Sequence, residues 1–206
     1  MTSSDSSLSV VRVETTAQDT FDREAKKRPV IFKPNRELDS DETWMFPDGS
    51  STGWHGLVVL RKGQDPRLLA REIPMATKNV GAEMSGFIMA LENIGPGERV
   101  AIVADFLWSI YYMLGWRNVH NPGLQEQVAA ARALLDARRP ASLRYIHIRG
   151  HERDDSAFGR WNHVADRLCA LRRPVDLTVP MSAFGEPGAR PRSLAKILDG
   201  VPAKGA

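Results

Sequence analysis

Cysteine is nearly absent from this chain of 206 residues, which contains only Cys169. A single cysteine excludes a disulfide within the chain and a zinc site built from pairs of Cys and His. We therefore expect a reducing compartment. The first nine residues include five serines and lack the basic start and the apolar run of a secretory signal, so we expect a cytoplasmic protein.

A long uninterrupted hydrophobic run is also missing. The nearest approach, residues 100–116, contains Asp105 and Ser109, and an ionised carboxylate inside a bilayer is costly. We interpret this run as a buried strand that leads into a helix, and we expect no membrane partner.

A strong excess of one charge sign is missing as well, since the formal net charge is +3. This excludes a protein that coats nucleic acid but is compatible with a local basic face. Residues 43–173 hold 17 basic and 13 acidic side chains and every Trp and His, so we expect them to form the working domain.

Residues 1–42 are expected to be a polar, mostly solvated extension with an edge strand at 30–32. Residues 174–206 are expected to be a tail interrupted by Pro and Gly, with one or two helical turns at 193–198.

Hydrophobic periodicity in residues 43–173 predicts an α/β domain. Strand patterns at 43–46, 56–60 and 68–73 are joined by connections of hairpin length, which favours antiparallel pairing. An apolar stripe at helical spacing runs from Val80 to Leu91. The elements expected after it are a buried strand at 100–104, helices at 106–114 and 123–138, a strand at 143–149 and a helix at 161–171. This order implies a mixed five-stranded sheet, three antiparallel strands and then parallel strands, flanked by helices.

Four acidic residues fall where such a sheet collects functional groups, at strand ends and on the helices beside them. Asp48 ends the first strand, Glu83 lies in the first turn of the first helix, Asp105 follows the buried strand and Asp166 lies on the last helix. Taken singly, each has a simpler explanation as a turn residue, a helix-end charge or a solvated helix acid. Their combination in this order favours one shared site.

Carboxylates held close together repel one another and become protonated unless a cation compensates them. Ligand sets made only of oxygen favour Mg²⁺ or Mn²⁺ over zinc. Because two such ions can clamp the attacking and leaving oxygens of a phosphoryl displacement, the pattern predicts phosphodiester chemistry with two Mg²⁺ ions, or Mn²⁺ in their place.

The motifs around these acids resemble those of ribonuclease H of type 1, in the RNase H-like superfamily, over roughly residues 43–173. The four motifs are Phe46-Pro47-Asp48-Gly49-Ser50, Thr77-Lys78-Asn79 with Ala82-Glu83-Met84, Ile102-Val103-Ala104-Asp105, and Ile148-Arg149-Gly150-His151 with Asn162-His163-Val164-Ala165-Asp166. Gly-His followed by Asn-x-x-Ala-Asp, with an acid on each earlier element, makes the resemblance fairly specific.

The resemblance implies an RNase H-like fold and endonucleolytic, Mg²⁺-dependent hydrolysis of the RNA strand in an RNA/DNA hybrid. Asp48, Glu83, Asp105 and Asp166 match the metal-binding carboxylates of the family. His151 matches a mobile histidine that assists proton transfer or product departure.

Substrate contacts follow from the same resemblance. Asn162 matches a residue that contacts the substrate or orients the last acid, and Asn79 one that reads the minor groove of the hybrid. Thr77 is a candidate for the pocket that holds a DNA phosphate, and Lys78 for gripping the substrate. Gly81 adds one residue between Asn79 and Glu83, which displaces Asn79 from the family pattern.

The basic helical handle with which many relatives grip the hybrid is missing, because residues 116–124 offer only Arg117 and His120. The grip must therefore come from elsewhere. The candidates are Lys78, Arg132, Arg138, Arg139 and Arg144, for which a solvated surface is an equal alternative.

Two other functions stay open. The fold can serve as a non-catalytic module for nucleic-acid binding or assembly, or as a nuclease for branched or single-stranded DNA. Four intact acids argue against the binding module, since a negative cluster facing phosphate gives it no benefit.

Overall fold

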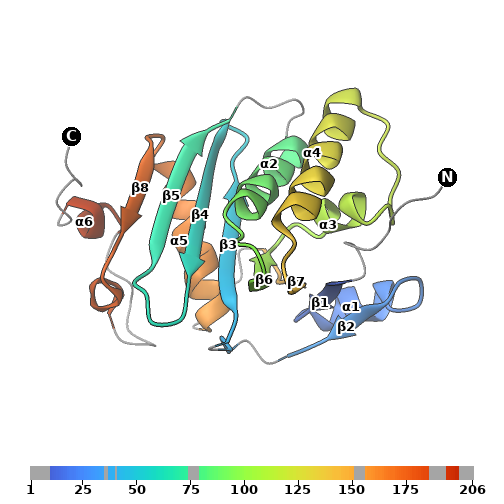
Figure 1. The fold of residues 1–206 in the computed structure, drawn as a ribbon, viewed down its shortest axis with the longest axis horizontal. Coiled ribbons are helices and arrows are strands. Elements are labelled where there is room, and N and C mark those ends of the chain that lie inside the picture. The colour runs from blue at the N-terminus through green and yellow to red at the C-terminus, as the bar shows by residue number, and fades with distance from the viewer. Residues whose placement is uncertain are drawn as a thin grey trace.

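The computed structural model of the protein describes residues 10–34, 37–39, 41–73, 79–150, 156–185 and 194–199. Its strands form one eight-stranded sheet in the order β2-β1-β7-β6-β3-β4-β5-β8 (Figure 1). The strands are β1 (Val11–Thr15), β2 (Val30–Phe32), β3 (Thr43–Gly49), β4 (Trp54–Leu60), β5 (Arg67–Glu72), β6 (Arg99–Ala104), β7 (Ser142–His147) and β8 (Val175–Thr178). The helices are α1 (Gln18–Glu24), α2 (Asn79–Glu92), α3 (Trp108–Met113), α4 (Pro122–Arg138), α5 (Ala157–Ala170), the 3-10 helix η2 (Met181–Phe184) and α6 (Leu194–Asp199).

Five of the eight strands form the mixed core that the sequence predicts. β4 pairs antiparallel with both β3 and β5, whereas β6 runs parallel to both β3 and β7. The order β7-β6-β3-β4-β5 places β6, the continuously apolar strand, between two parallel neighbours. The α/β fold class with its mixed sheet is therefore confirmed.

Helices cover both faces of the sheet. In Figure 1, α2 and α4 lie in front of the strands and α5 lies behind them. The front layer is built around Phe87, Ile110 and Leu135, and the rear layer around Phe158 and Leu168. Within the described ranges, each helix is too short or too polar to cross a bilayer.

Capping residues set where two of the helices begin. Asn121 accepts a hydrogen bond from the backbone N–H of Leu124 through its side chain, and Pro122 occupies the first turn of α4. Ser156 accepts one from Gly159 in the same way, so α5 begins at Ala157, four residues before the predicted start at Trp161. The prediction started at the first large apolar residue and overlooked the serine cap.

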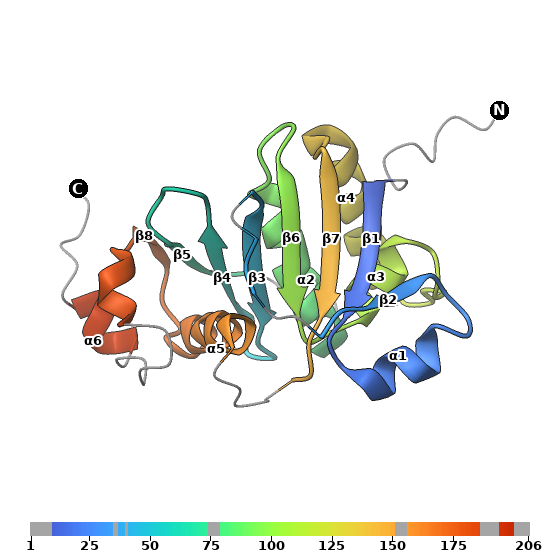
Figure 2. The same ribbon diagram turned by 90° about the horizontal axis from the view of Figure 1, so that it is seen from below.

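The N-terminal extension contributes two strands and a helix to the fold, where the sequence predicted a mostly solvated segment with one edge strand. β1 lies between β2 and β7 and is parallel to both (Figure 2). Its Glu14 is fully buried, with Arg144 and Lys33 within ion-pair distance. The segment looked solvated because its charged residues hid a strand whose one buried acid is compensated by distant cations.

The C-terminal region also packs against the sheet. β8 pairs antiparallel with β5 and so covers the edge of the predicted five-stranded core. Phe184 of η2 stacks edge-on against Trp161, and α6 buries Leu194, Ile197 and Leu198 in the rear core. The prolines keep these elements short, as expected, but short elements still bury apolar side chains.

Candidate active site

Three of the four predicted acids meet at one edge of the sheet. Asp48, Glu83 and Asp105 each offer a carboxylate oxygen, and these oxygens lie within 4.8 Å of one another. All three side chains are half-buried. They line a cavity of about 500 Å³, which Asp166 also lines. The structure thus brings together four residues whose consecutive members are 22 to 61 positions apart in sequence.

Strand register explains why Asp48 and Asp105 meet. β3 and β6 are parallel neighbours in which Met45 stands opposite Ile102. Three residues further along each strand are Asp48 and Asp105, so both carboxylates emerge at the same carboxyl edge. The hydroxyl of the buried Tyr145 on β7 donates to the carbonyl of Phe106 at 2.6 Å, which holds the chain just after Asp105.

Two glycines bring α2, and with it Glu83, close to β3. A Cβ atom on Gly49 would lie 2.2 Å from the carbonyl oxygen of Ala82. A Cβ atom on Gly86 would lie 3.0 Å from the carbonyl oxygen of Asp48. Because both positions lack a side chain, the helix backbone contacts the strand directly and Glu83 faces Asp48.

A third glycine passes beside Asp105. A Cβ atom on Gly150 would lie 2.8 Å from Oδ2 of Asp105, so the chain that leaves β7 passes this carboxylate at very close range. Gly150 belongs to the Gly-His pair of the fourth motif. This close approach explains why position 150 is occupied by glycine, which has no Cβ atom.

The electrostatics of the cluster indicate uncompensated negative charge. Burial, followed by the charges of Asp105 and Asp166, raises the pKa of Asp48 to about 6. Burial, followed by the charges of Asp48 and Asp105, raises the pKa of Glu83 to about 9. Carboxylates in this state gain from a divalent cation, and three converging oxygen ligands suit a hard ion such as Mg²⁺.

Asp166 occupies a different position from the other three acids. It lies on α5, is exposed and is not part of the compact cluster, although it lines the same cavity and contributes to the raised pKa of Asp48. Asn162 lies one turn before it on α5 and is half-buried. Asp166 therefore stands at the exposed rim of the cavity that holds the other three carboxylates.

Four other predicted site residues are not placed by the structure. Thr77, Lys78 and His151 lie outside the described residues. Asn79 begins α2, but its side chain also lies outside what is described. Their roles stay predictions.

The cavity residues that were not predicted from the sequence include Cys169 and Arg172. Cys169 is buried, lines the cavity and donates its thiol to the carbonyl oxygen of Asp48 at 3.5 Å. Burial raises the pKa of this thiol far above its usual range, so it stays protonated and acts as a support for β3. Arg172 also lines the cavity, with a left-handed backbone φ of 51°. The only signal for Cys169 was its place three residues after Asp166 on one helix.

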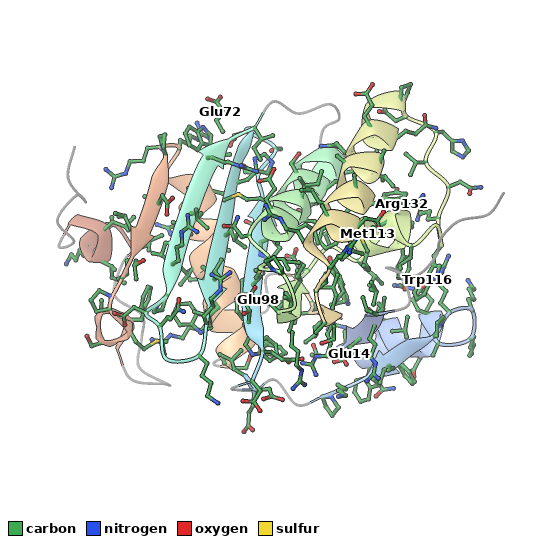
Figure 3. The ribbon with its side chains drawn as sticks, viewed as in Figure 1. Glu14, Glu72, Glu98, Met113, Trp116 and Arg132 are labelled. Carbon is green, nitrogen blue, oxygen red and sulfur yellow. The ribbon has the colours of Figure 1, made fainter. Side chains whose placement is uncertain are left out.

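Two of the arginines named as candidates for holding the substrate make contacts within the protein. Arg132 donates to the carbonyl oxygen of Met113 at 2.7 Å, which ties α4 to α3 (Figure 3). Arg144 lies within ion-pair distance of Glu14 and Glu42, with its guanidinium over the ring of Trp44. The partners of both side chains, a backbone carbonyl for the exposed Arg132 and two buried acids for Arg144, could not be read from the sequence. A role of either arginine in substrate binding stays a prediction.

The site and the fold together define an α/β protein with an acidic cluster suited to divalent cations at the carboxyl edge of a mixed sheet. No protein-family model matches the chain. The chain is 29% identical over 158 residues to the Pol polyprotein of Radiation murine leukemia virus (strain Kaplan), a match that covers 67% of this chain. It spans about a quarter, 26%, of that relative.

The similar solved structures include two ribonucleases H1 and one RNase H domain. The enzyme from the halophilic archaeon Halobacterium salinarum NRC-1 is 19% identical, with a TM-score of 0.49 over 63% of this chain and 95% of that one. LC11-RNase H1, from compost, in complex with an RNA/DNA hybrid, is 20% identical with the same TM-score and coverage. The RNase H domain of rv2228c from Mycobacterium tuberculosis is 24% identical, with a TM-score of 0.43 over 63% of this chain and 96% of that one.

Proposed function

We propose that this protein is a ribonuclease H, an endonuclease that hydrolyses the RNA strand of RNA/DNA hybrids with the help of divalent cations. The main support for the proposal is that carboxylate oxygens of Asp48, Glu83 and Asp105 lie within 4.8 Å of one another. All three residues belong to the motifs that resemble type 1 ribonuclease H. The relation to a viral Pol polyprotein supports it.

The chemistry of the donors fits Mg²⁺, with Mn²⁺ as the alternative. Asp48, Glu83 and Asp105 supply oxygen ligands, and the nearby thiol of Cys169 is directed to a backbone carbonyl. Asp166 would complete the set from the rim. When bound, a pair of such cations supplies positive charge to the attacking and leaving oxygens of an in-line displacement.

The protein's own residues orient the substrate and handle protons around that centre. Glu83, at the acidic cluster, would accept a hydrogen bond from a 2′-hydroxyl next to the scissile phosphate, and this contact would favour RNA at the cleaved position. His151 would move protons or help the product leave, and Asn79, Asn162, Thr77 and Lys78 would contact the hybrid. Recognition of shape and 2′-hydroxyls needs no base readout, so we expect little sequence preference.

A substrate panel tests the proposal. Labelled RNA/DNA hybrid, RNA duplex, DNA duplex, branched DNA and single-stranded DNA are incubated with the protein in Mg²⁺, in Mn²⁺ and in EDTA. The expected result is cleavage of the RNA strand of the hybrid alone, with either cation and not in EDTA.

One control variant and two contrary outcomes make this test specific. Asp105→Asn protein that keeps its circular dichroism spectrum is expected to lose cleavage, which excludes a contaminating nuclease. Cleavage of DNA substrates would point to the alternative nuclease, and hybrid binding without cleavage in any cation would point to the non-catalytic module. Either result would overturn the proposal.

A further inference from the structure

The N-terminal extension brings a helix to the edge of the sheet that holds the carboxylates. β1 is parallel to β7 with Thr15 opposite His147, so α1, which follows β1, starts at the same carboxyl edge as Asp105. The Oγ1 atom of Thr15 lies 3.1 Å from Nδ1 of His147. Asp19 on α1 forms an ion pair of 2.8 Å with Arg149. These contacts fix α1 against the end of β7.

A second cavity, of about 470 Å³, lies between α1 and the chain that follows β6. Asp105 lines both this cavity and the one that holds the acidic cluster, so the two are neighbours. A strand of nucleic acid whose phosphate sits at the acidic cluster therefore has α1 beside it.

The wall that α1 presents to this cavity is basic. Five residues of α1 and the turn after it line the cavity, and their spacing places them on one helical face. They are Thr20, Arg23, Glu24, Lys27 and Arg28. Glu24 is buried and bonded to Arg23, Arg28 and the hydroxyl of Tyr111, so its charge is compensated internally. Lys27 is exposed and forms no ion pair with any carboxylate in the described ranges.

The opposite wall adds an aromatic surface and another cation. Trp108 is 38% exposed, an unusual degree for so large an apolar side chain. The guanidinium of Arg117 lies over its ring, and Arg117 is itself exposed. Exposed aromatic rings beside cations are the arrangement with which proteins hold nucleic-acid strands without reading their sequence.

We propose that α1 and its following turn, together with Arg117 and Trp108, form a binding subsite for the sugar–phosphate backbone that flanks the scissile phosphate. Lys27 and Arg117 contact phosphates, and Trp108 contacts a sugar or base. The subsite rests on the proposed function, and it gives the N-terminal extension the gripping role that the missing basic handle leaves open.

The test measures binding separately from cleavage. Asp48→Asn protein serves as a background without cleavage, because Asp48 does not line the α1 cavity. In this background, Lys27→Ala with Arg117→Ala is titrated with a fluorescent RNA/DNA hybrid at several salt concentrations. Loss of two phosphate contacts is expected to weaken binding about three- to tenfold and to lower the slope of log K against log salt by about 1 to 2.

Two further variants make the result specific. Lys26→Ala removes another exposed cation of the same turn, one that does not line the cavity, and it is expected to bind as the background does. Lys27→Arg keeps the charge and is expected to keep the affinity. Should the double variant bind with the affinity and salt slope of Lys26→Ala, the subsite would be wrong.

Cleavage by the otherwise unchanged protein reports on the proposed function alone. Cleavage of hybrids combined with unaltered binding by the double variant overturns the subsite and leaves the enzyme. Absence of cleavage combined with weakened binding by the double variant overturns the enzyme and supports a subsite for nucleic acid.

Discussion

Gly49 on β3 and Ala82 on α2 are in direct backbone contact, so close that a Cβ atom on Gly49 would lie 2.2 Å from the carbonyl oxygen of Ala82. This contact sets the distance between Asp48, which precedes the glycine, and Glu83, which follows the alanine. The geometry of the acidic cluster therefore depends on a residue that carries no functional group.

Gly49→Ala is expected to push α2 away from β3 and to separate the two carboxylates. Overpacking of this kind costs about 1–3 kcal/mol of unfolding free energy. Urea denaturation measures that cost, and the rise in Tm on adding Mg²⁺ measures the state of the cluster. Ser50→Ala, at the next position, adds no atom and serves as the control. If Gly49→Ala matched that control in both measurements, the contact would not set the geometry.

The cation-free protein is expected to lose stability as pH rises. Asp48 and Glu83 have pKa values of about 6 and about 9 in the fold, above their ordinary values of 3.8 and 4.5. Because both pKa values are raised, the fold favours the protonated form of the two carboxyl groups. The stability that this protonation contributes is complete below pH 4 and is lost as the pH rises through 6 and then 9.

Glu83→Gln removes the carboxyl group with the more strongly raised pKa, and with it the larger loss of stability at high pH. In EDTA at pH 8, its Tm is expected to exceed that of the unchanged protein, by about 2–4 °C for each kcal/mol regained, whereas the two should agree near pH 4. Differential scanning calorimetry across this range provides the measurement. Glu126→Gln, a change at an exposed helix glutamate, should leave the pH profile as it is. A parallel pH dependence in Glu83→Gln and the unchanged protein would contradict the prediction.

Asp166 is expected to differ from the clustered acids in cation binding. Asp48, Glu83 and Asp105 form the compact set and Asp166 stands exposed at the rim. Asp48→Asn is therefore expected to abolish the Mg²⁺-induced rise in Tm, whereas Asp166→Asn keeps most of it and loses cleavage. Isothermal titration calorimetry with Mg²⁺ provides a second measurement, in which Asp48→Asn is expected to bind the ion more weakly than Asp166→Asn. Equal loss of binding in both variants would mean that Asp166 moves into the cluster when the ion binds.

Arg144 is expected to be a major source of stability at the junction with the N-terminal extension. It lies within ion-pair distance of the buried acids Glu14 and Glu42. Arg144→Ala would remove this cation from both acids and leave Lys33 beside Glu14. Removing one partner of a buried ion pair costs about 3–5 kcal/mol, which urea denaturation can measure. Arg12, opposite Arg144 in the β1–β7 register but exposed, gives the control variant Arg12→Ala. Adding Glu14→Gln and Glu42→Gln should restore part of the loss, and no restoration would argue against a charge effect.

The ends of the strands were the most predictable part of the site. Asp48 and Asp105 follow apolar segments that were predicted as strands of one mixed sheet, and functional groups gather at the carboxyl ends of central strands. That these two strands are parallel neighbours came from the structure. Glu83 was predictable as a helix residue, but its approach to Asp48 depends on Gly49 and Gly86, whose packing no periodicity reveals.

The surroundings of the site were less predictable, because they depend on contacts between distant segments. Arg144 looked like a surface cation until the burial of Glu14 and Glu42 was known. The basic wall of α1 was missed for the related reason that its sequence mixes acids and bases, and only the fold shows that Glu24 is turned inward to its partners.

The position of β1 bears on the order in which the chain assembles. Thr15 and His147, whose side chains meet at the end of β1, are 132 residues apart, so this contact joins two paired strands that are far apart in sequence. During synthesis, β3, β4, β5 and α2 are complete before β7 exists, and until then β1 can pair only with β2. The segment made early is thus among the last to dock, and α1 reaches the carboxylates only after the sheet around them has formed.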